Sequence, residues 1–149
     1  MKKFKPTIFI LFFLIFSTLN TSSCSRTQDT VSCFPEVTIQ VMLNLNLPAY
    51  YPLQNIGGWI YLNEQSAGTR GLIVVRTNTG FKIYDRNAPH ICPDNNTTLE
   101  VKDNIKVICP KDGAEWILLT GQPTAIAQVP PKTYHYNYDA GSNILNIFN

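Results

Sequence analysis

The chain has 149 residues, of which 44% are hydrophobic and 15% are charged, so it is long enough for one domain with its own core. Its net charge of +2 depends on Lys2, Lys3 and Lys5: without residues 1–23, nine basic residues (12 minus 3) stand against ten acidic ones, a balance of −1. Because nucleic-acid binding needs a clustered basic face, the sequence argues against a nucleic-acid partner.

The N-terminus has the pattern of a targeting segment. The basic stretch "MKKFKP" precedes the apolar run "TIFILFFLIFSTL", which is shorter than the roughly 20 apolar residues that cross a bilayer. A basic start and a short apolar run are typical of a secretory signal. Small residues lead into Cys24 in "NTSSCSR", which resembles a bacterial lipoprotein signal, although Thr21 stands where Leu is usual. An ordinary signal peptide with an incidental Cys24 is the alternative.

We therefore expect a signal peptide over residues 1–23, a polar tether over 24–35 and a folded domain over 36–149. The resemblance to a lipoprotein signal implies that Cys24 is lipidated. The protein would then be exported to the cell envelope and bound to a bacterial membrane through its N-terminal lipid.

The first half of the expected domain has the period-2 pattern of half-buried strands. Apolar residues alternate along residues 36–47 until Pro48, which predicts a strand. A loop and a short aromatic strand follow over residues 48–64. The apolar run 72–75 and the segment "FKIYD" are separated by "TNTG", which predicts a hairpin with Phe81 and Ile83 on one face.

The second half alternates between loops and short strands. "RNAPHICPDNNTT" predicts an irregular loop, and "LEVKDNIKVIC" predicts a hairpin that turns at Asp103–Asn104. A turn at Asp112–Gly113 leads to a strand from Trp116 to Leu119, an irregular loop over residues 120–131 and a last hairpin that turns at Ala140–Gly141. No segment after residue 23 shows a sustained helical period, so we expect an all-β sandwich or barrel.

Four segments, in this order, carry a family resemblance: "IYDRNAPH" (83–90), "VICPKDGAEW" (107–116), "LLTGQP" (118–123) and "VPPKTYHYNY" (129–138). Over about residues 70–149 the chain resembles a Rieske iron–sulfur domain. The resemblance implies an antiparallel all-β sandwich or barrel with two tip loops. In that family the loops hold a [2Fe–2S] cluster that transfers electrons.

The ligands implied by the resemblance are incomplete. A Rieske centre uses two Cys thiolates and two His nitrogens, and each loop supplies one of each. In the first loop Ala88 occupies the Cys position and His90 the His position. In the second loop Cys109 occupies the Cys position and Asp112 the His position. Only His90 and Cys109 are inherited ligands, so we expect no cofactor, with a 2Fe–2S cluster as the alternative.

The cysteines of an exported protein are expected to form disulfides. With Cys24 lipidated, three cysteines remain, which allows one internal pair. We expect a Cys92–Cys109 disulfide, which closes a loop of about 17 residues and stabilises the domain by about 3 kcal/mol. This bond would exclude Cys109 as a metal ligand. Cys33 has no assignable partner.

Simpler roles exist for several candidate residues. His90 can be a solvated loop residue, and Asp112 before a glycine suits a tight turn. Trp116 and the tyrosines at strand spacing are expected to pack in the core, whereas His135 faces the opposite side without a partner at ligand spacing. The packing tyrosines are Tyr134, Tyr136 and Tyr138.

Two functions follow from these observations. The first is a Rieske-like domain without its cluster, which acts as a binding or structural module of the cell envelope and is not an enzyme, because no activated nucleophile, phosphate-binding loop or informative carboxylate pair is found. The sequence identifies no protein partner. The alternative is an electron-transfer protein, or a mononuclear metal site, with a non-standard ligand set: His90, Cys109, Asp112 and, as an additional candidate, Cys92.

Overall fold

The computed structural model of the chain describes residues 30–149, so the expectations for the signal peptide and for Cys24 lie outside the described residues. Within this part the backbone forms ten strands and one short 3-10 helix. The helix is too short and too polar to span a bilayer, and no other helix is present in residues 30–149. The elements are β1 (Gln40–Asn44), η1 (Pro48–Gln54), β2 (Trp59–Leu62), β3 (Leu72–Thr77), β4 (Gly80–Asp85), β5 (Glu100–Lys102), β6 (Lys106–Ile108), β7 (Glu115–Ile117), β8 (Pro123–Ala125), β9 (His135–Asp139) and β10 (Ile144–Phe148).

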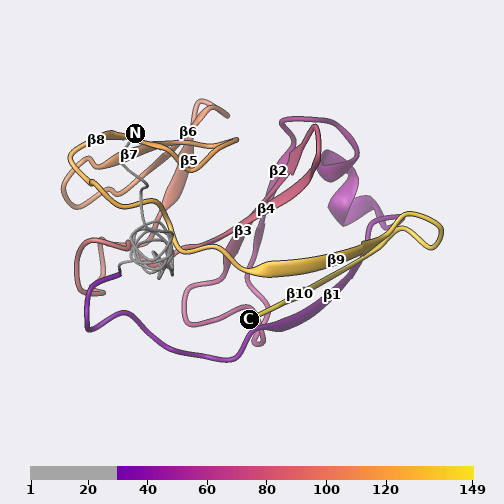
Figure 1. Ribbon diagram of the computed structural model, residues 1–149, viewed down its shortest axis with the longest axis horizontal. Helices are drawn as coiled ribbons and strands as arrows, with labels where there is room; N and C mark the ends of the chain where they lie inside the picture. Colours follow the sequence, from indigo (N-terminus) through magenta and orange to yellow (C-terminus); the bar gives the residue numbers. More distant parts are fainter. Residues whose placement is uncertain (1–29) are drawn as a thin grey trace, which may run out of the picture.

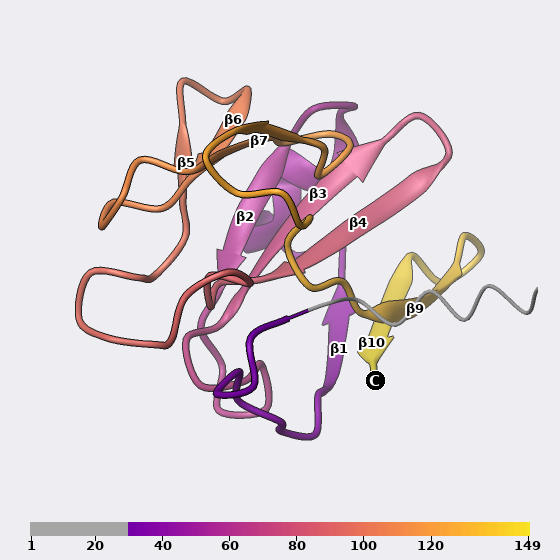
Figure 2. The ribbon, with the colours of Figure 1, turned by 60° about the vertical axis from the view of Figure 1, so that its left-hand side comes forward.

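The strands form three antiparallel sheets, which confirms the expected all-β antiparallel fold. Their strand orders are β1-β10-β9, β2-β3-β4 and β5-β6-β7-β8. We call the first two sheets the base, and we call the third sheet, with residues 86–99 and 109–114, the tip. Figure 1 shows the tip at one end of the molecule and the β9–β10 hairpin at the other, and Figure 2 shows the β3–β4 hairpin between them.

The base follows from the alternating sequence pattern. In β1, Val41 and Leu43 are buried while Met42 between them is exposed, and β10 pairs Ile147 with Val41 and Leu145 with Leu43. These buried side chains pack against the β2-β3-β4 sheet in one hydrophobic cluster. Alternation at a period of two is what places one apolar face of a strand on a core.

The expected strand over residues 36–47 is longer than the observed β1. The strand ends at Asn44, and the 3-10 helix η1 begins at Pro48, which the sequence pattern did not predict. Proline is well suited to the first turn of a helix, because its fixed φ is already helical and its missing N–H has no partner to lose there.

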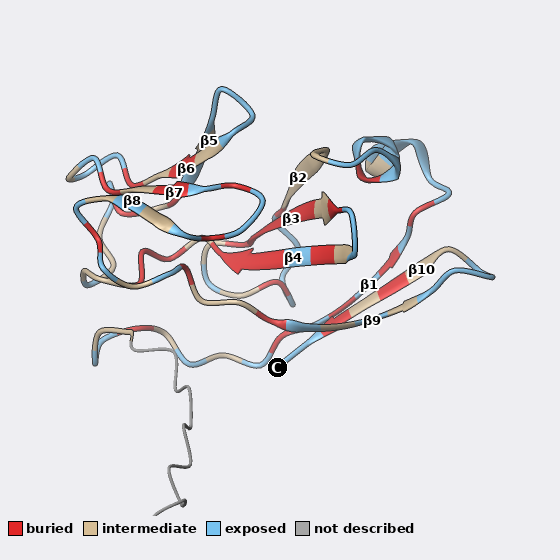
Figure 3. Cartoon of the chain, turned by 45° about the horizontal axis from the view of Figure 1, so that its top comes forward, coloured by how far each residue is buried: buried red, intermediate tan, exposed pale blue. Residues whose placement is uncertain are grey.

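Strand β3 separates two hydrophobic cores. Leu72 and Val74 point into the core of the base, whereas Ile73 and Val75 point into the core of the tip. All four side chains are fully buried, and Figure 3 shows β3 as the most continuously buried strand. The sequence of a strand that is buried on both faces is a continuous run of apolar residues, and residues 72–75 have this pattern.

The tip is built from strands of three residues each. Its first hairpin turns at Asp103 and Asn104, as expected, with positive φ angles of 54° and 58°. Strand β7 ends at Ile117 and not at Leu119, because the Gly121 N–H donates to the Ile117 carbonyl (2.7 Å) and turns the chain. The segment 120–131, expected to be irregular, contains β8, which pairs with β7.

Two buried side chains make hydrogen bonds near the junction of the tip and the base. The Trp116 indole is fully buried and donates to the Val129 carbonyl (2.8 Å). The buried Asp85 carboxyl group accepts the Tyr134 hydroxyl (2.6 Å) and the backbone N–H of Asn87 (2.7 Å). The Asp85 bonds fix the start of the first tip loop against the segment that enters β9, and the Trp116 bond holds β7 to the segment between β8 and β9.

The last hairpin agrees with the sequence pattern. It turns over residues 140–143 between β9 and β10. Tyr134, Tyr136 and Tyr138 pack against the base core, which confirms their expected role, whereas His135 lies on the exposed face.

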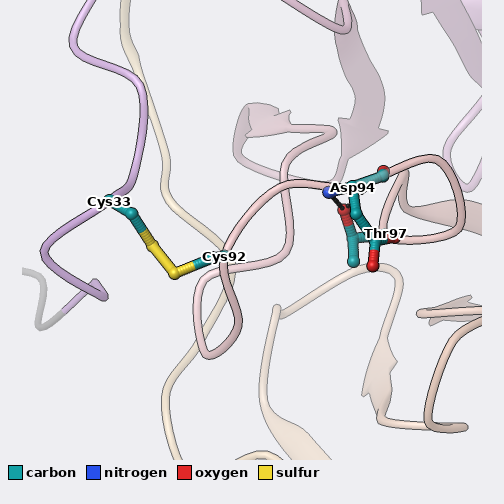
Figure 4. The surroundings of a disulfide bond; sticks show 4 residues. All are labelled: Cys33, Cys92, Asp94 and Thr97. Atoms are coloured by element: carbon teal, nitrogen blue, oxygen red, sulfur yellow. Dashed lines mark hydrogen bonds between the residues drawn. A yellow bond between two sulfur atoms is a disulfide. The ribbon is translucent and has the colours of Figure 1, made fainter.

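The predicted Cys92–Cys109 disulfide is wrong. Cys92 is bonded to Cys33 with Cα atoms 5.6 Å apart, and Cys109 is a buried free thiol among the described cysteines. Figure 4 shows the bond joining the N-terminal segment to the first tip loop. The Val31 N–H donates to the Pro89 carbonyl (3.0 Å), which holds the N-terminal segment beside that loop and brings Cys33 to Cys92.

The same contacts correct the expected domain boundary. Residues 30–35 were assigned to a polar tether, but Phe34 is buried and Cys33 is bonded to the first tip loop. The Lys132 ammonium group also lies 5.0 Å from the centre of the Phe34 ring. These six residues belong to the folded domain.

Candidate functional site

The first tip loop, residues 86–99, is irregular but held by many hydrogen bonds. Its ends are closed by the Leu99 N–H, which donates to the Arg86 carbonyl (2.7 Å). Inside the loop the Asp94 N–H donates to the Thr97 hydroxyl (2.8 Å), as drawn in Figure 4. The Arg70 guanidinium group donates to the Asp94 carbonyl (2.6 Å) from outside the loop. Side-chain to backbone bonds of this kind replace the ladder bonds of regular structure.

The second tip loop, residues 109–114, is a tight turn. The Gly113 N–H donates to the Cys109 carbonyl (2.9 Å), and the Cys109 N–H donates to the Ala114 carbonyl (2.9 Å). The Asp112 carboxylate caps the turn by accepting the Ala114 N–H (3.1 Å). Gly113 has a φ of 76°, a conformation that glycine adopts without strain. The turn chemistry expected of Asp112–Gly113 is therefore present.

The two loops meet through His90 and Asp112. The His90 Nε2 atom lies 2.6 Å from the Asp112 Oδ2 atom, and their side chains are 14% and 27% exposed. The His90 ring also packs edge-on against Trp116, with ring centres 5.5 Å apart. His90 is thus held in the tip, and the alternative of a solvated loop histidine is wrong.

Cys109 completes a group of three potential metal ligands. One ligand atom from each of His90, Cys109 and Asp112 lies within 4.8 Å of the others. The structure thereby brings together three of the four residues of the non-standard ligand set. The fourth, Cys92, is excluded because its sulfur is bonded to Cys33.

The electrostatics of the group follow from burial and hydrogen bonding. Burial acts to raise the pKa of the Asp112 carboxyl group, but hydrogen bonds from His90, the Ala114 N–H and the Cys109 thiol outweigh it, and the pKa is lowered. Burial raises the pKa of the Cys109 thiol, and the neighbouring Asp112 adds to this effect. At neutral pH the site therefore holds a carboxylate and a protonated thiol.

These donors do not fit a [2Fe–2S] Rieske centre. That centre needs two thiolates and two imidazoles. Ala88 is buried and offers no donor atom, and Cys109 is the free thiol among the described cysteines. The second histidine, His135, lies on β9 against Phe148, with ring centres 6.1 Å apart. Within residues 30–149 the tip thus offers one sulfur and one nitrogen donor, and not the two of each that the cluster needs.

Comparison with known proteins adds one distant likeness. No protein family matches the chain, and no curated protein matches it. Among solved structures the chain is similar to the ferredoxin of carbazole 1,9a-dioxygenase from Nocardioides aromaticivorans IC177, with a TM-score of 0.41 and 16% sequence identity. The match covers 75% of this chain and 97% of that chain.

Proposed function

We propose that the protein is a Rieske-like domain of the bacterial cell envelope that carries no iron–sulfur cluster and acts as a binding or structural module. The observation that carries the proposal is the direct contact of 2.6 Å between His90 Nε2 and Asp112 Oδ2. By the resemblance of the sequence, these residues occupy the positions whose side chains would bind the same iron. Here the two side chains satisfy each other.

The hydrogen-bonded contact of His90 with Asp112 supports this reading because it joins the two loops without an iron–sulfur cluster. The lowered pKa of Asp112 keeps the carboxylate charged, so it is a strong acceptor for the His90 imidazole. Asp112 also caps its own turn through the Ala114 N–H. One side chain therefore fixes the second loop and links it to the first.

The disulfide supports export. Disulfides form and persist in oxidising compartments outside the cytoplasm and are rare within it. The Cys33–Cys92 bond closes 59 residues of chain and attaches the N-terminal segment to the tip. Together with the signal-like residues 1–23 and Cys24, it favours a protein that matures in the envelope and is held there by an N-terminal lipid.

The thiol of Cys109 does not favour an enzyme. A cysteine nucleophile reacts as a thiolate and is found where the pKa is lowered and the sulfur is accessible. Cys109 is fully buried, its pKa is raised, and its side-chain partner is the Asp112 carboxylate. A binding or structural role is the simpler function for this tip.

Iron analysis and absorption spectroscopy test the absence of a cluster. The full chain, purified from membranes of a bacterial host under anaerobic conditions, is expected to be colourless and to contain no iron. A Cys109→Ala variant should give the same spectrum as the wild type. Visible bands with two irons per wild-type chain, lost in Cys109→Ala, would contradict the proposal.

The lipid anchor is tested separately. A Cys24→Ser variant is expected to lose lipid labelling and to leave the membrane fraction, whereas the neighbouring Ser25→Ala variant should keep both. If Cys24→Ser still sediments with membranes, another segment attaches the protein and the lipidation assignment is wrong.

A further inference from the structure

The three tip side chains offer a mixed set of donor atoms. A thiol, an imidazole and a carboxylate come from two loops, and their ligand atoms lie within 4.8 Å of one another. Cys109 and Asp112 are separated by two residues in a tight turn, a spacing that is common between two ligands of one metal ion. His90 approaches from the other loop.

The charge and type of these donors select the ion. A thiolate, a carboxylate and a neutral imidazole sum to −2, which a divalent cation neutralises. Zn²⁺ accepts sulfur, nitrogen and oxygen donors together, often with three protein ligands and an open fourth position. Mg²⁺ and Ca²⁺ favour oxygen donors alone, so a buried sulfur argues against them.

The second loop is arranged to receive a metal-bound thiolate. The backbone N–H groups of Lys111 and Asp112 donate to the Cys109 sulfur and favour its charged form. A thiol that coordinates a cation loses its proton, and these two N–H groups would then donate to the thiolate sulfur.

The imidazole presents its Nε2 atom to the group. The His90 Nδ1 atom is buried and has no hydrogen-bond partner among the described residues, while Nε2 contacts Asp112. The exposed fractions of His90 and Asp112 leave one side of the group open to solvent.

We propose that His90, Cys109 and Asp112 bind one Zn²⁺ ion, with a water molecule in the fourth position. Two ligands of one tetrahedral zinc lie about 3.4 Å apart, given metal–ligand bonds of about 2.1 Å. The 2.6 Å contact of Nε2 with Oδ2 is shorter, so the ion replaces this hydrogen bond and the two side chains separate by less than about 1 Å. The proposal is independent of what the module binds and of the absence of a cluster.

Calorimetric titration with ZnCl₂ tests the site. The full chain, purified without a histidine tag and stripped with a chelator, is expected to bind one Zn²⁺ and to unfold at a higher temperature when Zn²⁺ is present, because the ion binds only the folded state. Co²⁺ in place of Zn²⁺ should give the absorption band of a cobalt–thiolate bond. Cys109→Ser should abolish that band.

Single-residue variants distinguish Zn²⁺ binding at the tip from non-specific Zn²⁺ binding elsewhere on the surface. His90→Gln and Asp112→Asn, whose side chains are partly exposed, are expected to fold and to weaken Zn²⁺ binding by at least about tenfold. His135→Gln and Asp139→Asn remove an equivalent histidine and an equivalent carboxylate far from the tip and should bind as the wild type does. Absence of one-to-one binding, or unchanged binding in His90→Gln and Asp112→Asn, would overturn the proposal. The iron analysis above is unaffected by either result.

Discussion

The base and the tip are stabilised in different ways. In the base, strands of four to six residues pair over their whole length, and apolar side chains from β1, β3 and β10 alternate into one core. In the tip, four strands of three residues each carry long loops, and the structure depends on single contacts. These contacts are the Cys33–Cys92 bond, the His90–Asp112 pair and the buried Trp116.

This difference shows where the chain is free to change. A core that is shared by many alternating residues tolerates substitution by other apolar residues of similar volume. A loop that is fixed by one residue pair depends on those residues alone. The tip is thus the region in which a few substitutions can exchange one kind of site for another while the base persists.

Removal of Trp116 should have the largest effect and should be confined to the tip. Trp116→Ala leaves a cavity in the tip core and removes the hydrogen bond to Val129, which is expected to cost about 3–5 kcal/mol. Chemical denaturation measures the loss. Hydrogen exchange should be faster in β5–β8 than in the wild type, with β1, β9 and β10 still protected. An equal loss of protection in both regions would show that base and tip unfold as one unit.

Loss of the disulfide should come next. The double variant Cys33→Ser/Cys92→Ser is expected to lose about 2–4 kcal/mol, because the bond restricts an unfolded chain over 59 residues. Reduced wild type is the control and should match the variant. Peptide mapping of the oxidised protein must show Cys33 joined to Cys92, and a Cys92–Cys109 peptide would contradict the structure.

Two buried tyrosines at the junction of base and tip give a matched comparison. Tyr134 donates to the buried Asp85 carboxyl group, so Tyr134→Phe is expected to cost about 1–3 kcal/mol. The Tyr84 hydroxyl is buried without a partner among the described residues, so Tyr84→Phe should be neutral or stabilising. Urea denaturation of both variants checks the contrast, and equal losses would contradict it.

The smallest expected effect is a loss of stability at alkaline pH, caused by two buried tyrosines. Burial raises the pKa of Tyr84 and of Tyr134, and for Tyr134 the bond to Asp85 adds to the effect. Above about pH 10 the unfolded chain loses these protons and the folded chain keeps them, so stability falls as pH rises. Tyr84→Phe should flatten the slope measured by urea denaturation between pH 9 and 11. An unchanged slope would show that Tyr84 ionises in the folded state.

The sequence predicted the base better than the tip. Alternating residues predicted β1, the β3–β4 hairpin and the β9–β10 hairpin, because a half-buried strand must repeat every two residues. The helix η1 was missed because Pro48 and Pro52 interrupt any pattern and seven residues are too few to show a helical period.

The contacts of the tip could not be predicted from local sequence. Cys33 lies in a segment without a repeating pattern. Its contact with the first tip loop depends on the hydrogen bond between Val31 and Pro89, which are 58 residues apart in the sequence. Comparison with the Rieske ligand pattern identified the three side chains that converge, but it described Asp112 as a replacement and gave no reason to expect its bond to His90. Only the folded arrangement of both loops shows that bond.

The Cys33–Cys92 bond also has a consequence for orientation at a membrane. Cys24 and Cys33 are nine residues apart, and a fully extended chain of nine residues spans at most about 30 Å. If Cys24 is lipidated, the segment that joins the lipid to the folded domain is short and enters the domain at the tip. The β9–β10 hairpin lies at the opposite end of the molecule (Figure 1). Cys33 and the first tip loop bonded to it would then stay within about 30 Å of the bilayer surface.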